Sequence, residues 1–380
     1  MRLFTNRGLR RAHELLETAQ KANQAEQFAQ AEESARQAVE LYARAGRRGA
    51  EGVAVGRAAL GWAIRGQGRG AEAERELRAA LTAPGITSAG RAAVRTELAH
   101  VLRADRRHAE ALEEIRRAVV EARATMWLLG ARQAHALLLG ESGRHREAAE
   151  VLNSLAAECR RANPPQSQLA LATGSNRLTH LAYLGEHAEV DQEVPRLRAA
   201  AGTVPEPAAT LVWVSAANTL AMSRSLRGRH TEAEELLRET LAERGVPDSF
   251  ALTLHINLSR ALLGQGRPEE AGEAVEAARA IAAGMPALSE NDRSALGLAA
   301  ANVHLALGRP AEAEQEARQA MARCADAPAH RVLELRTALG IAKQRQGRGD
   351  STLAGALADW RAHFGAEHHG TVAARQALAG

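Results

Sequence analysis

The chain has 380 residues, of which 46% are hydrophobic but only 3% aromatic, and 49 basic residues nearly balance 45 acidic ones to give a net charge of +4. A core built mainly from Ala, Leu and Val suits closely packed helices better than a β-sandwich. The balanced charge gives no evident stripe to track phosphates, and the few aromatic side chains give few stacking platforms. These features argue against nucleic-acid binding.

The cellular compartment is predicted from the lack of a disulfide framework, of a signal peptide and of a membrane-spanning segment. It has only two cysteines, Cys159 and Cys324, far apart along the chain, so no disulfide framework is expected. The first residues, MRLFTNRGLRRAHELL, contain no apolar segment of the kind found in signal peptides. No apolar run approaches the length of a membrane span. We therefore expect a cytoplasmic protein.

Taken in chain order, the sequence predicts a series of helical hairpins. The first pairs residues 5–24 with 28–45, and the second pairs 51–66 with 70–83. The third turns at Asp105-Arg106, the fourth covers residues 125–163, and the fifth is irregular because Pro195 lies where a helix interior is expected. After the loop GTVPEP, the sixth to eighth hairpins are the most regular, and the ninth turns at Gln346-Gly347. We expect residues 1–365 to form the array, with residues 366–380 as a capping helix or an unfinished repeat.

Each hairpin is recognised by its turn, where a glycine commonly ends the first helix. A small or β-branched residue, most often Ala, follows five positions later, where the second helix would lie close against the first. Successive turns are 37 to 43 residues apart, the period of a helical solenoid. The turn residues are Glu26, Gly68, Arg106, Gly143, Gly185, Gly228, Gly266, Gly308 and Gly347.

The chain resembles the tetratricopeptide repeats, especially the longer-period kind of kinesin light chains and actinobacterial regulators. The resemblance is carried by the pattern G-R-x-x-E-A at 143–148, 228–233 and 308–313, and by Asn176 and Asn257 nine residues before a turn glycine. The segment 364–379 is similar to the entry of such a repeat. The resemblance implies an all-α, right-handed superhelical solenoid of about nine helix-turn-helix repeats with a C-terminal helix. It also implies that the first helix of each repeat lines a concave groove.

Positions ten, nine and six before the turns select side chains that would face this groove. Asn and Gln amides can both donate to and accept from an extended peptide backbone. Arg260 could hold a carboxylate or a phosphate through two parallel hydrogen bonds. Contacts between helices, or exposure to water, are the alternative explanation for these side chains. The candidate partner-binding residues are Gln133, Asn176, Thr179, Asn218, Asn257, Arg260 and Asn302.

Histidines recur directly after the turns, and two are adjacent near the C-terminus. His145, His187 and His230 occupy one position of the repeat, which predicts a solvated turn. Successive residues of a helix diverge around its axis, so His368 and His369 are not expected to bind a metal together. No motif for a metal, a nucleotide or a catalytic nucleophile stands out. We therefore expect neither an enzyme nor a cofactor.

The leading hypothesis is a protein-interaction module that binds a peptide or extended partner segment in its concave groove. The alternative is a regulator that changes superhelical shape when a peptide or small molecule binds, with the Pro195 region as a hinge. Homo-oligomerisation through the C-terminal tail stays open, because Val372 and Leu378 would need cover.

Overall fold

The computed structural model describes residues 2–105, 107–122, 126–162, 166–285, 288, 290–322, 329–349 and 351–379. The turn residue Arg106 and Cys324 lie outside this set. Within it the regular structure is entirely helical, as expected for a helical solenoid. The helices form two compact units, residues 1–138 and 139–380, whose boundary falls inside the helix Met126–Glu141.

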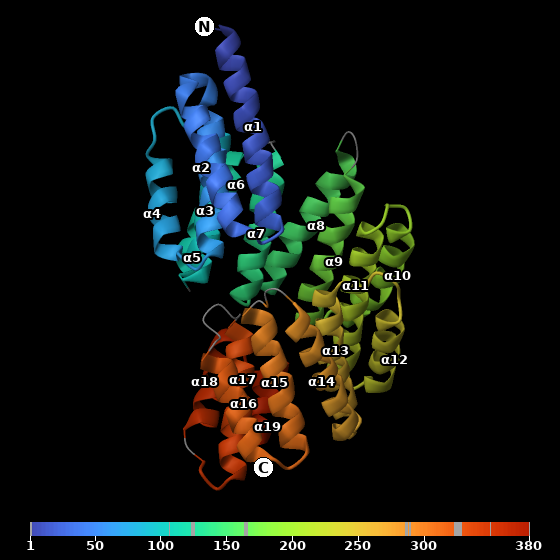
Figure 1. The fold of residues 1–380 in the computed structure, drawn as a ribbon. Helices are drawn as coiled ribbons and strands as arrows, with labels where there is room; N and C mark the ends of the chain where they lie inside the picture. Colours follow the sequence, from blue (N-terminus) through green and yellow to red (C-terminus); the bar gives the residue numbers. More distant parts are fainter. Residues whose placement is uncertain are drawn as a thin grey trace. The chain divides into compact units, whose positions relative to one another are not determined.

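Unit 1 contains three hairpins and most of the next helix (Figure 1). Its helices are α1 (Arg2–Gln24), α2 (Phe28–Arg44), the short 3₁₀ helix η1 (Gly46–Gly49), α3 (Ala50–Gly66), α4 (Gly70–Leu81), α5 (Ser88–Ala104), α6 (His108–Ala122) and α7 (Met126–Glu141). The expected hairpins 5–24/28–45 and 51–66/70–83 are thus present, with ends shifted by a few residues.

Unit 2 continues the series from α8 to the last helix. Its helices are α8 (His145–Arg161), α9 (Ser167–Tyr183), α10 (His187–Ala201), α11 (Ala208–Leu226), α12 (His230–Leu241), α13 (Asp248–Gly264), α14 (Pro268–Gly284), α15 (Glu290–Ala306), α16 (Pro310–Ala322), α17 (Ala329–Arg345), α18 (Thr352–Phe364) and α19 (His369–Ala379). Helix α10 continues through Pro195. The described helices therefore alternate as nine consecutive first and second helices, α1/α2 to α17/α18, followed by α19.

The turn positions have the backbone conformation that the sequence predicts. All seven turn glycines have φ between 69° and 78°, and Glu26, which replaces glycine in the first turn, has φ of 57°. The small residue five positions later is fully buried in the first eight hairpins, at 0% exposure for each. Close approach of the two helices thus depends on this small side chain. The buried residues are Ala31, Ala73, Ala111, Ala148, Val190, Ala233, Ala271 and Ala313.

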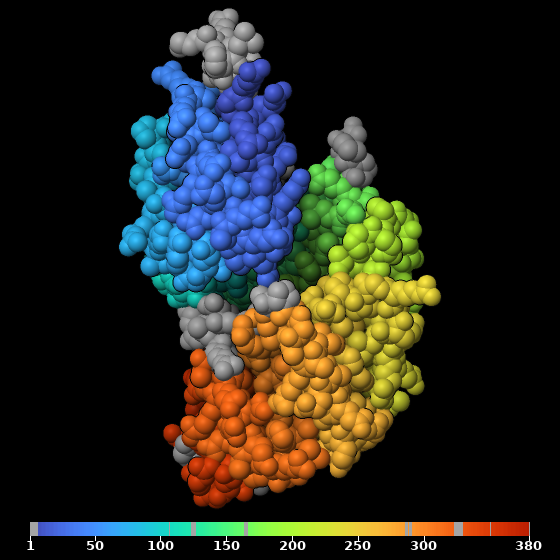
Figure 2. Space-filling model, in the orientation of Figure 1, coloured from blue at the N-terminus to red at the C-terminus, as the bar shows by residue number. Residues whose placement is uncertain are grey.

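The first helices form the inner layer of each unit. Helices α1 and α3 contact each other, as do α3 and α5, and in unit 2 the contacts run from α9 through α11, α13, α15 and α17 to α19. The second helices instead contact the first helices on either side of them. A layer whose members approach one another directly lies on the inside of a curve. In Figure 2 the successive repeats of unit 2 form adjacent coloured bands, as expected for a solenoid.

In several repeats an arginine after the turn links the repeat to the one before it. Arg267 donates to Glu270 of its own repeat at 2.5 Å and to Glu234 of the previous repeat at 2.6 Å. Glu234 lies six residues after its own turn glycine. The same arrangement joins Arg69 to Glu72 and Glu32, Arg107 to Glu110 and Glu74, and Arg229 to Glu232 and Asp191. The G-R-x-x-E-A pattern is therefore an ion-pair motif as well as a turn motif.

The C-terminal helix α19 packs against α17 and α18. Trp360 of α18 is 1% exposed and donates its indole N–H to Thr337 of α17 at 3.1 Å. A Cβ at Gly370 of α19 would lie 2.6 Å from the Trp360 ring, so the two helices are in close contact. Helix α19 thus covers Trp360 of the ninth hairpin, while Leu378 remains 44% exposed. No described helix has the length and hydrophobicity needed to cross a bilayer.

Candidate functional site

The inner layer of unit 2 carries a half-buried arginine, Arg260 of α13. No acidic side chain among the described residues lies within 4.0 Å of its guanidinium. Its charge nevertheless contributes to lowering the pKa of His330 and Glu334 of α17, and it acts in the same direction on the pKa of Tyr183 of α9. Helices from the fifth, seventh and ninth repeats therefore meet around one unpaired cation.

Tyr183, the last residue of α9, lies at the centre of this group. Its ring stacks on His145 with centroids 4.8 Å apart and an interplanar angle of 13°. On its other side it meets His330, with centroids 5.4 Å apart. The exposed ring of His369 in α19 lies 6.4 Å away. The first turns of α8, α17 and α19 thus meet the end of α9.

His145 is 7% exposed, and its Nδ1 lies 3.1 Å from Nδ1 of His180. One of these nitrogens must carry a hydrogen and donate it in a hydrogen bond that the other nitrogen accepts, so the two rings have opposite tautomers. A Cβ at Gly140 would lie 2.4 Å from the His180 ring, so glycine is needed there for the pair to fit. The Nε2 atom of His145 is buried without a hydrogen-bond partner in the described structure.

Burial keeps these histidines neutral at neutral pH. It lowers the pKa of His145 to about 3, and the neighbouring histidines contribute further. Burial also lowers the pKa of His180 to about 4 and that of His330 to about 4. An imidazolium would lose its hydration there. The site therefore consists of neutral rings beside the charged groups of Arg260, Arg331 and Glu334.

Glu334 and Arg331 form an ion pair at 2.6 Å within the first turns of α17. Burial raises the pKa of Glu334, but the charge of Arg331, followed by that of Arg260, outweighs burial and leaves it below its ordinary value. Glu334 is thus ionised, and the two arginines exceed it by one positive charge. The Nε of Arg331 is buried without a hydrogen-bond partner among the described residues. The arrangement is suited to an anionic group.

The C-terminal hairpin borders the site. The His368 ring stacks on Phe364 and Trp360, with centroids 4.8 Å and 5.2 Å apart. Phe364 in turn lies 3.0 Å from the position of a Cβ at Gly143, in the first turn of unit 2. Unit 2 therefore closes on itself, because its last hairpin contacts its first turn.

The predicted residues are distributed unevenly over this surface. Asn257 donates its amide N–H to the Asn218 carbonyl at 2.7 Å, joining α13 to α11, and both side chains are half-buried. Thr179 lies 3.1 Å from Thr219 of α11, as expected for a contact between helices. Among the other predicted residues, Asn176 is exposed on α9, Asn302 is half-buried on α15, and Gln133 is half-buried on α7 in unit 1.

The prediction for the histidines after the turns is wrong. They do not occupy a solvated turn, because this position points toward the first helix of the next repeat. His145 stacks on Tyr183, His187 lies 2.8 Å from the Ser223 hydroxyl, and His230 packs on Gly264. In the first repeat Phe28 packs on Gly66 in the same way. Three of these four contacts join the residue two after one turn to the residue two before the next, a pairing that could have been found in the sequence, whereas His187 reaches Ser223, five residues before its next turn.

The adjacent histidines near the C-terminus also differ from expectation. The rings of His368 and His369 do not diverge but lie 4.1 Å apart. Within the described part of the chain, no group of three or more His, Cys, Asp or Glu side chains has the geometry to hold a metal ion. The observed stacking instead gives His368 a packing role against Trp360.

Comparison with known proteins identifies the repeat. Residues 213–244, which cover most of α11 and α12, match the family described as tetratricopeptide repeat. The chain is thus a helical repeat protein that carries a tetratricopeptide repeat at these residues, and such repeats generally mediate protein–protein interaction and are typically non-enzymatic. A comparison with curated proteins gave no match.

Two solved structures are similar to the chain. A tetratricopeptide repeat protein from Parabacteroides merdae ATCC 43184 is 17% identical, with a TM-score of 0.49 over 74% of this chain and 95% of that one. The APC/C hetero-tetramer Cut9-Hcn1 contains a chain that is 11% identical, with a TM-score of 0.34 over 97% of this chain and 96% of that one.

Proposed function

We propose that the inner surface of unit 2 binds an extended segment of a partner protein and that Arg260 holds an acidic group of that segment. The observation that carries this proposal is the unpaired, half-buried guanidinium on an inner helix. A guanidinium presents two parallel N–H donors that match a carboxylate. Its half-buried position reduces screening by water and strengthens the attraction.

The Asn218–Asn257 pair supplies groups for the backbone of the segment. Their mutual hydrogen bond uses one amide hydrogen and one carbonyl oxygen. Chemically, the Asn218 amide can still donate, and the Asn257 carbonyl can still accept. A donor and an acceptor side by side suit the alternating N–H and C=O groups of an extended chain. Asn257 lies one helical turn before Arg260, so backbone and side-chain recognition would be adjacent.

The remaining predicted residues have different roles in this proposal. Exposed Asn176 and half-buried Asn302 would extend the surface along α9 and α15. Thr179 would act indirectly by holding α9 against α11 through Thr219. Gln133 belongs to unit 1.

The test is quantitative capture of partners from native lysate with the tagged full-length chain. We expect the genuine partner to be lost with Asn257→Ala/Arg260→Ala and retained with Arg244→Ala, an exposed arginine in the loop after α12. The purified partner should then bind the double variant at least about tenfold more weakly, as expected for loss of a charge-assisted contact. Equal affinity for the wild type and the double variant excludes this site.

A second candidate function is a ligand-responsive regulator, which the contact between Tyr183 and His330 favours. A ligand that separated α9 from α17 would open unit 2 and change its shape. Small-angle scattering of the full chain with and without a captured ligand tests this possibility. An unchanged profile at saturation favours a rigid binding surface instead.

A further inference from the structure

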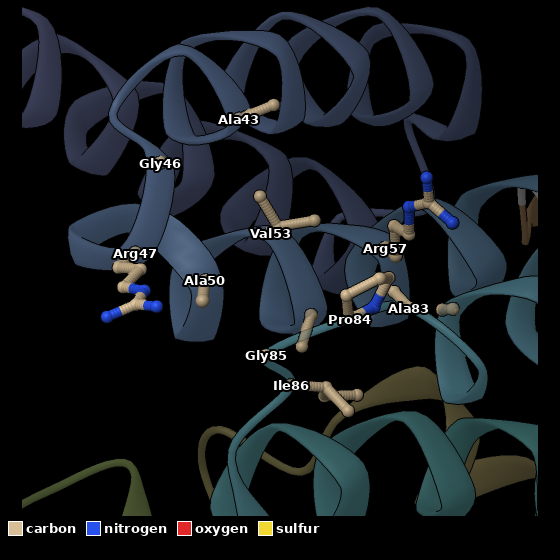
Figure 3. Close-up of a pocket in the computed structure, with 12 residues that line it drawn as sticks. Ala43, Gly46, Arg47, Ala50, Val53, Arg57, Ala83, Pro84, Gly85 and Ile86 are labelled. Atoms are coloured by element: carbon tan, nitrogen blue, oxygen red, sulfur yellow. The ribbon is translucent and has the colours of Figure 1, made fainter.

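Unit 1 contains a pocket of about 450 Å³ between its first and second repeats. The end of α2 and η1 form one side, the first half of α3 forms the floor, and the loop after α4 closes the other side. Figure 3 shows Val53, Ala50, Pro84 and Ile86 facing the space from these elements. A volume of this size is typical of a ligand pocket rather than a packing defect.

The lining is apolar except for two arginines. Small aliphatic side chains and backbone form the walls, and Ala54 and Ala80 at the base are 3% and 2% exposed. Arg47 and Arg57 lie at opposite ends of the apolar floor, as Figure 3 shows. Neither has an acidic side chain within ion-pair distance among the described residues. Elsewhere in unit 1 arginines such as Arg69 and Arg107 are paired with glutamates.

We propose that this pocket binds a short segment of a partner protein in which a bulky aliphatic residue is flanked by acidic residues. The aliphatic side chain would fill the space between Val53 and Ile86, where it removes apolar surface from water. The acidic residues before and after it would reach Arg47 and Arg57. A single carboxylate, as in a free fatty acid, would leave one of the two guanidinium groups unused. The separation of the two charges across an apolar floor thus favours a peptide.

This site is independent of the one in unit 2. It shares no residue with the inner surface around Arg260, because all its lining residues belong to unit 1. The two proposals can therefore fail separately.

The probe is a short fluorescein-labelled peptide with a central leucine between glutamates, and anisotropy is measured with the full-length chain. We expect binding that weakens about tenfold with Arg47→Ala/Arg57→Ala and falls with ionic strength. Arg48→Ala is the matched control, because Arg48 is an exposed neighbour that does not line the pocket, and it should bind nearly as tightly as the wild type. Replacing the leucine of the peptide by glycine should weaken binding at least as much, without any change to the protein.

Three results would overturn the proposal. Equal binding of the leucine and glycine peptides would reduce the contact to general electrostatic attraction. Loss of binding with Arg260→Ala but not with Arg47→Ala/Arg57→Ala would place the peptide in unit 2. Saturable binding of decanoate in the same pocket, with no binding of the leucine peptide, would identify a small amphipathic ligand instead.

Discussion

Tyr183 and His330 are 147 residues apart in the sequence, yet the hydroxyl oxygen of Tyr183 lies 3.5 Å from Nε2 of His330. In a solenoid each repeat contacts mainly its neighbours, so a contact between α9 and α17 means that the inner layer of unit 2 curves back on itself. The stacked His145 on the other face of Tyr183 extends this junction to α8. The charge of Arg260 acts on both residues of this junction.

The junction can be tested by removing the ring of Tyr183. We expect Tyr183→Ala to speed amide hydrogen exchange in the first turns of α17 and α19, because both helices lose the ring they pack on. Tyr183→Phe keeps the stacking on His145 and should change exchange little. Hydrogen-exchange mass spectrometry of the full chain compares the two variants. Equal exchange in wild type and Tyr183→Ala would show that other contacts close unit 2.

The neutral histidines predict a loss of stability on mild acidification. Unfolded histidines titrate near pH 6.5, whereas His145, His180 and His330 have lowered pKa values of about 3 to 4 when folded. As the pH falls below about 6.5, the unfolded chain binds protons that the folded chain does not bind. The thermal midpoint should therefore fall steadily between about pH 6.5 and pH 4. The groups facing these rings are Tyr183, Arg260, Arg331, Glu334, His368 and His369.

The same prediction has a residue-specific control. His145→Phe keeps an aromatic ring on Tyr183 but cannot titrate, so the midpoint should depend less on pH in this window. His13→Phe, which changes a histidine that is 69% exposed, should leave the dependence as it is in the wild type. A pH dependence that is the same in all three proteins would assign the effect to other groups.

The ion-pair motif between repeats predicts unequal effects for two adjacent glutamates. Glu234 accepts hydrogen bonds from Arg267, Arg238 and Gln265, and its side chain is 11% exposed. Burial raises its pKa, but the hydrogen bonds from Gln265, Arg238 and Arg267 outweigh burial and lower it. Glu234→Gln should thus lower the thermal midpoint by a few degrees, roughly the effect of 1 kcal/mol.

Glu235→Gln is the matched control, because Glu235 is exposed and its position in the repeat makes no such link. The difference between the two variants should shrink below about pH 4, where carboxylates in the unfolded chain are protonated. A lowered folded pKa contributes stability that is fully present above the unfolded pKa and is lost as the pH falls through the folded pKa. Equal midpoints for Glu234→Gln and Glu235→Gln at neutral pH would contradict a role in joining repeats.

The sequence predicts the repeats well because each turn is a local event. Gly266 and its counterparts supply a positive φ, and Ala271 and its counterparts supply close packing, so spacing alone locates the hairpins. The interaction between Arg267 and Glu270 is equally local and follows from the repeated pattern.

The candidate site is less predictable because it depends on curvature. Arg260 and Asn257 can be assigned to an inner helix from their position before the turn. No local sequence pattern predicts that Tyr183 contacts His330. That contact results from the small rotations between successive repeats, which accumulate from α9 to α17. From the sequence alone, Thr179 could either bind a partner or form a contact between helices. The contact with Thr219 in the structure supports the second explanation. The pocket beside η1 depends on the backbone path after α2, which the composition of Gly46–Gly49 does not specify.

We expect truncation of the C-terminal helix α19 and a substitution on its exposed surface to have different effects. A chain ending at Gly365 would uncover Trp360, which is 1% exposed, so we expect aggregation rather than a clean change in oligomeric state. Leu378→Glu changes only an apolar side chain that is 44% exposed and should leave the fold intact. If the tail joins two chains, sedimentation equilibrium should show a dimer for the wild type and a monomer for Leu378→Glu. The same mass for both proteins would mean that α19 serves only to cover the last hairpin.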